Sequence, residues 1–159
     1  MVKVAPERVK PNLTRAFLGG LVGTAALTLM MYKVAPMMTG KPMDIAGMLG
    51  QMLGGWTIGM VMHVINGTVI FPLAYALLLH RFLPGPPVVK GMVWGVILWL
   101  IAQLTVLPMM GAGVFSMNAG GPKAAMASLI GHLVYGALLG SIAREDLGAP
   151  AQAPPPAQF

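Results

Sequence analysis

Two histidines lie inside apolar stretches of this chain, and their side chains are the ones best suited to chemistry there. His63 is followed four residues later by Gly67, and His132 is followed at the same spacing by Gly136. Ionisable side chains are costly at membrane depth and usually serve a function where they occur. A glycine at that spacing lies on the histidine's face of a helix and leaves space there. The duplicated His-x-x-x-Gly motif therefore predicts one site to which both imidazoles contribute.

Two imidazoles on facing helices can hold a flat macrocycle between them, as in a bis-histidine haem b. In this hypothesis His63 and His132 are the axial ligands, while Gly67 and Gly136 make room for the ring. Haem b is the cofactor that the pattern allows, although our first expectation is a chain without a cofactor.

The simpler interpretation is that each histidine hydrogen-bonds a neighbouring helix, because polar side chains commonly hold membrane helices together. Three other polar residues lie at suitable depth and form the expected polar interior of the bundle: Asn66, Gln103 and Tyr135. We expect these three to be the hydrogen-bond partners of the two histidines.

Methionine is unusually frequent, with 15 residues, many of them in or beside segments 36–55 and 108–121. Thioethers are soft ligands that select Cu(I), which gives a copper-handling alternative. Methionine also fills irregular apolar gaps and partner-facing surfaces. We interpret the methionines in this second way and expect no metal site.

The acidic residues and the lack of cysteine exclude several kinds of chemistry. The four acids, Glu7, Asp44, Glu145 and Asp146, all lie outside the apolar runs, and the chain has no cysteine. Proton relays and acid–base pairs built from carboxylates in the membrane are therefore excluded. Iron–sulfur clusters, covalent c-type haem and a thiol nucleophile are excluded as well. We expect a protein that is not an enzyme.

The composition places the chain in the membrane class, since 57% of its residues are hydrophobic and only 9% are charged. About 20 apolar residues in a helix cross the ~30 Å hydrocarbon core of a bilayer. Four such runs predict an all-α, four-helix transmembrane bundle with spans at 16–35, 56–79, 88–107 and 123–142. Asp44 is a suitable first residue for a short interfacial helix over 44–53.

Basic residues flank the apolar runs, so membrane topology accounts for the net charge of +6 and no nucleic-acid partner is expected. Their excess on one side predicts a multi-pass protein of the bacterial inner membrane with both termini in the cytoplasm. The predicted divisions are a cytoplasmic segment 1–15, a transmembrane domain 16–143 and a disordered Ala/Pro/Gln-rich tail 144–159.

The transmembrane domain contains an internal repeat of one helical hairpin. Gly19, Gly23 and Pro36 recur at one constant spacing as Gly91, Gly95 and Pro108. The repeat predicts parallel hairpins over 16–80 and 88–143, related by a pseudo-twofold axis along the membrane normal. We expect the four glycines of the repeat to lie at helix–helix contacts, because small residues let helices approach closely.

With this duplicated hairpin, residues 13–143 resemble the small bacterial four-span membrane proteins grouped as domains of unknown function. The resemblance implies a fold but no activity. We expect an accessory subunit of a larger respiratory or electron-transfer membrane complex, in contact with the bilayer and with other integral membrane subunits. The alternatives are a bis-histidine b-type haem protein and a copper or small-solute transporter.

Overall fold

The computed structural model describes residues 12–79 and 81–144, and these residues form helices and loops without a strand. Four helical segments are long and apolar enough to cross a membrane: Leu13–Thr39, Trp56–Leu79, Pro87–Met109 and Gly121–Ile142. The four predicted spans are confirmed, at nearly the predicted bounds. The chain is an all-helical, multi-pass membrane protein.

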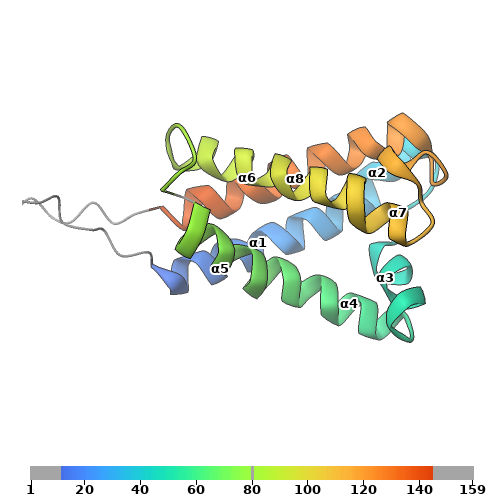
Figure 1. Cartoon of the computed structure of the whole chain (residues 1–159), viewed down its shortest axis with the longest axis horizontal. Helices are drawn as coiled ribbons and strands as arrows, with labels where there is room; N and C mark the ends of the chain where they lie inside the picture. Colours follow the sequence, from blue (N-terminus) through green and yellow to red (C-terminus); the bar gives the residue numbers. More distant parts are fainter. Residues whose placement is uncertain (1–11, 80, 145–159) are drawn as a thin grey trace, which may run out of the picture.

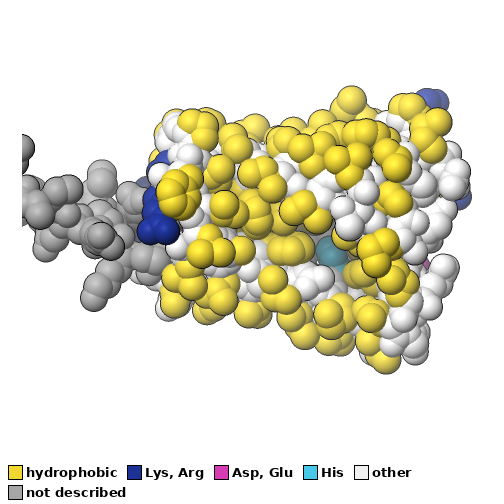
Figure 2. Space-filling model, in the orientation of Figure 1, with side chains coloured by type: hydrophobic (Ala, Val, Ile, Leu, Met, Phe, Trp, Pro, Cys, Tyr) yellow, Lys and Arg dark blue, Asp and Glu magenta, His cyan; other side chains and the backbone are white. Residues whose placement is uncertain are grey.

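The spans form two hairpins that begin at the same end of the bundle (Figure 1). The α-helices are α1 (Leu13–Leu29), α2 (Ala35–Thr39), α3 (Ile45–Leu53), α4 (Trp56–Ile65), α5 (Phe71–Ala74), α6 (Pro87–Ile101), α7 (Leu107–Met109) and α8 (Gly121–Ile142), with a 3₁₀ turn at Val114–Ser116. We call the end that holds residues 12, 81–86 and 144 the terminal end, and the opposite end, with residues 40–55 and 110–120, the loop end. Hydrophobic side chains cover the face between the two ends, while lysine and arginine gather at the ends (Figure 2).

A π-helical turn precedes the proline in three of the four spans. These turns are Met30–Val34 before Pro36, Asn66–Ile70 before Pro72 and Ala102–Val106 before Pro108. Proline has no amide hydrogen, and its ring clashes with the carbonyl four residues earlier. The π turn relieves this clash because the amide before the proline bonds five residues back, as the amide of Phe71 does to the carbonyl of Asn66. The first and third of these turns are separated along the chain by the same number of residues as Gly19 and Gly91. The internal repeat therefore extends to the backbone conformation.

The four glycines of the repeat all lie against α8, which packs closely with both α1 and α6. A Cβ on Gly91 would lie 1.9 Å from the carbonyl oxygen of Gly136, and one on Gly95 would lie 2.2 Å from that of His132. Gly23 similarly faces the ring of Tyr135, and Gly19 faces Leu139. Small residues at these positions therefore allow α1 and α6 to approach α8 closely.

The loop end is fixed by Asp44, which caps α3 by accepting a hydrogen bond from the amide of Gly47 at 3.0 Å. The same carboxylate accepts hydrogen bonds from the Tyr32 hydroxyl of the first span and from the Trp56 indole at the start of α4. Partial burial raises the pKa of Asp44, but the hydrogen bonds from Tyr32, Gly47 and Trp56 outweigh it and lower the pKa below 3.8. The predicted short helix is therefore present and joined to two spans.

Several sequence predictions lie outside the described residues. They concern most of the N-terminal segment 1–15, nearly all of the tail 144–159, and His80, for which we expect an exposed side chain. These expectations stay predictions.

Candidate ligand-binding cavity

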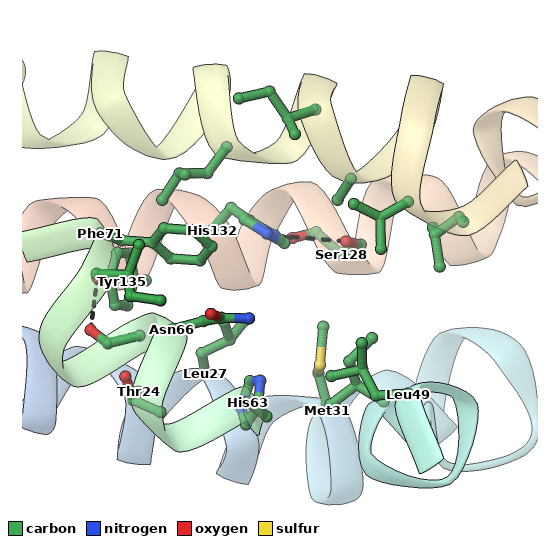
Figure 3. Close-up of a pocket in the computed structure, with 18 of the residues that line it drawn as sticks. Thr24, Leu27, Met31, Leu49, His63, Asn66, Phe71, Ser128, His132 and Tyr135 are labelled. Carbon is green, nitrogen blue, oxygen red and sulfur yellow. Dashed lines mark hydrogen bonds between the residues drawn. The ribbon is translucent and has the colours of Figure 1, made fainter. Parts of the chain in front are cut away.

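A cavity of about 380 Å³ lies between the two hairpins, in the part of the bundle nearer the loop end. Its walls come from the first three spans and α8, and α3 lies over its loop end. His63 enters it from α4 and His132 from α8, with Asn66 between them in the view of Figure 3. The structure thus brings both predicted histidines to one site.

His63 is 9% exposed, and its Nε2 lies 2.9 Å from the hydroxyl of Thr28 on α1. That hydroxyl donates its single hydrogen to the carbonyl of Thr24, at 2.7 Å. Toward His63 it can therefore only accept, so Nε2 carries the ring hydrogen. A charged imidazolium would be costly at membrane depth, so the ring is neutral and its Nδ1 is an acceptor. No other hydrogen bond to this ring comes from the described part of the chain.

His132 is held by its own helix. Its Nδ1 lies 2.8 Å from the carbonyl oxygen of Ser128, one turn earlier on α8. A carbonyl can only accept, so Nδ1 carries the hydrogen and Nε2 is left with a lone pair. A backbone carbonyl on one ring nitrogen orients metal-bound histidines in the same way, since it fixes the tautomer and leaves the other nitrogen available.

The predicted hydrogen-bond partners of the histidines are wrong. Gln103 accepts a hydrogen bond from Ser116 at 2.9 Å, and Tyr135 donates to the carbonyl of Gly67 at 2.8 Å. The Asn66 amide lines the cavity and has no hydrogen bond to another described residue. Neither Thr28 nor Ser128 was anticipated, although the Ser128 spacing of one helical turn before His132 was visible in the sequence.

The carbonyl of Gly67 needs Tyr135 because of the π turn. In an α-helix this carbonyl would accept from the amide of Phe71, but that amide bonds to Asn66. The next residue is Pro72, which has no amide hydrogen. In a regular helix Pro72 would leave the carbonyl of Thr68 without a donor, whereas the carbonyl that a side chain satisfies here is that of Gly67.

The two motif glycines both allow close packing, but only one of them lines the cavity. Gly67 lines the cavity, and a Cβ there would lie 2.1 Å from the hydroxyl oxygen of Thr24. Gly136 is not among the residues lining the cavity, because it packs on the backbone of Gly91 in α6. Gly136 therefore does not make the predicted space for a ring. For Gly67 that role stays a prediction, because its missing Cβ makes room for Thr24.

The chain matches DUF6789, described as a family of unknown function, over residues 11–152. It belongs to this family. The match confirms the expected resemblance to a family of unknown function. Comparison with curated proteins and with solved structures gave no match.

Haem b fits the cavity of this DUF6789 chain only in part. The two imidazoles match the number of axial ligands in a bis-histidine haem. However, the Nε2 of His63 is occupied by Thr28, and no lysine or arginine lines the cavity to pair with the two carboxylates of the macrocycle. Nor do the described residues contain a cluster of three or more His, Cys, Asp or Glu that could hold a metal ion. The number of imidazole ligands fits a bis-histidine haem, but the lack of basic residues in the cavity walls does not fit its two carboxylates.

Proposed function

We propose that this DUF6789 chain is a non-enzymatic inner-membrane protein that serves as an accessory subunit of a larger respiratory or electron-transfer complex. Its contribution to that complex is the cavity between the hairpins. The proposal rests on one observation. Two neutral imidazoles line the cavity, and each has one ring nitrogen without a hydrogen-bond partner among the described residues. Polar groups at membrane depth are stabilised when they find a partner, so such a cavity favours binding of another molecule.

A binding role is further supported by the placement of acidic groups. Asp44 is the acid within the described range, and its carboxylate is engaged by Tyr32, Gly47 and Trp56 rather than directed to the histidines. The cavity walls offer imidazole, amide and hydroxyl groups but no carboxylate. This set suits recognition better than acid–base chemistry, for which a second titrating partner is usually needed.

The surface toward a partner subunit is proposed on the ends of the first and third spans, next to the loop end. Met37 and Met109 are 85% and 67% exposed, and they occupy equivalent positions in the two hairpins. Exposed methionines suit an adaptable contact surface because the thioether chain is flexible and polarisable. We therefore place the contact with other integral membrane subunits on these two residues and their neighbours.

The orientation belongs to the same proposal. The terminal end and the segment before it carry more basic residues than the loop end, and basic residues favour the cytoplasmic side. The first group is Lys3, Arg8, Lys10, Arg15, Arg81, Lys90 and Arg144, and the second is Lys33, Lys41 and Lys123. Both termini then lie in the cytoplasm and the methionine surface lies on the opposite side.

The test is purification of the tagged chain from its native membranes in a mild detergent. We expect a complex of fixed stoichiometry that contains redox-active subunits. The double variant Met37→Glu/Met109→Glu should release the chain, while Met37→Leu/Met109→Leu, which keeps the apolar surface, should not. Recovery of the wild-type chain alone, in every mild detergent tried, would refute the accessory-subunit proposal.

A bis-histidine haem protein is the second candidate, and the convergence of His63 and His132 on one cavity is the observation in its favour. An absorbance spectrum of the reduced, purified chain tests it directly. A Soret band and an α band that both disappear in His132→Leu would establish haem and displace our first proposal. Metal analysis of the same sample tests the copper alternative.

A further inference from the structure

We propose that the cavity binds a lipid-soluble ring that carries hydroxyl groups, such as a phenol or hydroquinone on an apolar tail, and that this molecule enters sideways from the bilayer. The inference rests on the proposed role of the cavity as a binding site and names the chemical class of its ligand.

The hydrogen-bonding pattern of the walls selects the ligand's hydroxyl groups. The tautomers fixed by Thr28 and by the Ser128 carbonyl leave His63 Nδ1 and His132 Nε2 as lone-pair acceptors. Two acceptors are matched by a molecule that brings donors, and a hydroxyl is the neutral donor common to small apolar molecules. The Asn66 amide adds a group that can donate or accept at the same wall.

The charge and polarity of the walls select a neutral, mostly apolar molecule. The lining includes leucine, isoleucine, methionine, phenylalanine and tryptophan side chains, but no lysine, arginine, aspartate or glutamate. An ion would have to leave water without an opposite charge to compensate it. An apolar ring that carries hydroxyl groups has no charge to desolvate, and its few polar atoms find hydrogen-bond partners in the cavity. Cavities of this size and mixed lining are typical of sites for small molecules.

The entrance faces the bilayer between the second and third spans. Ile70 and Ile101 both line the cavity, yet they are 47% and 48% exposed, so they stand at its mouth. The mouth is open because α4 packs mainly on α3, whereas α6 packs mainly on α8. Figure 2 shows the surface hollowed in this region, with a histidine visible inside. A molecule dissolved in lipid can therefore reach the imidazoles without passing through water.

A tryptophan is among the residues that line the cavity. Trp94 lines the cavity, is 5% exposed, and its indole nitrogen has no hydrogen-bond partner. That nitrogen is closed off from the cavity, so recognition of the ligand rests on the two imidazoles and the Asn66 amide. The same indole offers a fluorescent reporter at the site.

The experiment measures binding of hydroquinone carrying a ten-carbon alkyl tail to the full chain in lipid nanodiscs, without oxygen, by quenching of tryptophan fluorescence. The matched ligand is the dimethyl ether of the same molecule, which keeps the ring and tail but lacks both hydroxyl donors. We expect saturable binding of the hydroquinone, with binding of the ether weakened about fivefold to tenfold for each hydrogen bond lost.

Variants of the chain locate the binding. His63→Leu and His132→Leu should each weaken hydroquinone binding about fivefold to tenfold and leave the affinity for the ether unchanged. Ile101→Trp should block the mouth and abolish binding of both ligands. Leu100→Trp is its matched control, because Leu100 is exposed on the same helix but does not line the cavity. Circular dichroism of each variant establishes that the bundle is folded.

Equal affinity for the hydroquinone and its ether would overturn the inference, because the cavity would then recognise apolar volume alone. Lack of saturable binding, or binding that Ile101→Trp leaves intact, would overturn it as well. Failure of the accessory-subunit proposal is a separate result, since it is read from co-purification of partner subunits with the wild-type chain and needs no added ligand.

Discussion

Removal of one hydroxyl group, in Tyr135→Phe, tests how this bundle tolerates a proline inside its second span. The Tyr135 side chain is 1% exposed, and its hydroxyl lies 2.8 Å from the carbonyl oxygen of Gly67. The π turn directs the amide of Phe71 to Asn66, and Pro72 has no amide hydrogen to offer. The substitution therefore leaves a buried carbonyl without its observed donor.

The expected loss of stability follows from that carbonyl. Hydrogen bonds between membrane helices contribute about 0.6 kcal/mol on average and up to about 1.7 kcal/mol. A buried acceptor left without a partner costs about 1–3 kcal/mol. Because Tyr135 is enclosed and phenylalanine fills nearly the same volume, the lost bond dominates and we expect a loss of about 1.5–2 kcal/mol.

The assay is unfolding of the purified chain in mixed detergent micelles, followed by circular dichroism as the fraction of denaturing detergent rises. Ser141→Ala is the control, because the exposed Ser141 hydroxyl donates to the Ala137 carbonyl of its own helix. A surface change of this kind should alter the free energy of unfolding by less than about 0.5 kcal/mol.

A double-mutant cycle with Pro72→Ala sharpens the test. An alanine restores an amide hydrogen at position 72 and lets the helix supply the missing donor. Tyr135→Phe should then cost much less in the Pro72→Ala background than in the wild type. An equal cost in both backgrounds, or no cost in either, would refute the account of the π turn given above.

Three further outcomes are expected. Gly91→Ala should destabilise the bundle by about 1–3 kcal/mol, since its Cβ would meet the Gly136 backbone, whereas Gly131→Ala meets only a movable leucine side chain and should be tolerated in the same assay. Because folding lowers the pKa of Asp44, its carboxylate stabilises the loop end above pH 3.8. This stabilisation is lost as the pH falls through the lower pKa of the folded state. Asp44→Asn should remove this acid dependence from thermal unfolding curves. Cysteines replacing Met117 and Pro86 should react with an impermeant thiol reagent from opposite sides of the membrane, the first from the periplasm, and the reverse pattern would invert the proposed orientation.

The sequence predicts the spans and the short helix well because each depends on local properties. A run of apolar residues of sufficient length is a helix in a membrane whatever its neighbours are, and Asp44 needs only its own following residues to cap α3. The repeat was also visible, since Gly19 and Gly91 share one register with the prolines.

The hydrogen bonds of the site could not be predicted in the same way. Which side chain faces His63 depends on how α1 is rotated about its axis, and the sequence of α4 holds no information about that rotation. Serine and threonine in membrane helices also bond their own backbone, as Ser141 does, so their presence alone does not identify a partner for histidine. The role of Gly136 was missed for a related reason, since a glycine makes room equally for a ligand or for a helix.

The π turns described above change how positions along the spans are compared. Each turn absorbs one more residue than a regular helical turn, so beyond it the chain is out of phase by one residue, or ~100° of rotation about the helix axis. A helical-wheel projection drawn through Pro36, Pro72 or Pro108 therefore assigns the residues after the turn to the wrong side. α8 has no such turn over Gly121–Ile142, and it is the one span along which a single wheel stays in phase. The phase of the other three spans is best counted separately on each side of every π turn, including a second turn at Tyr75–Leu79 in the second span.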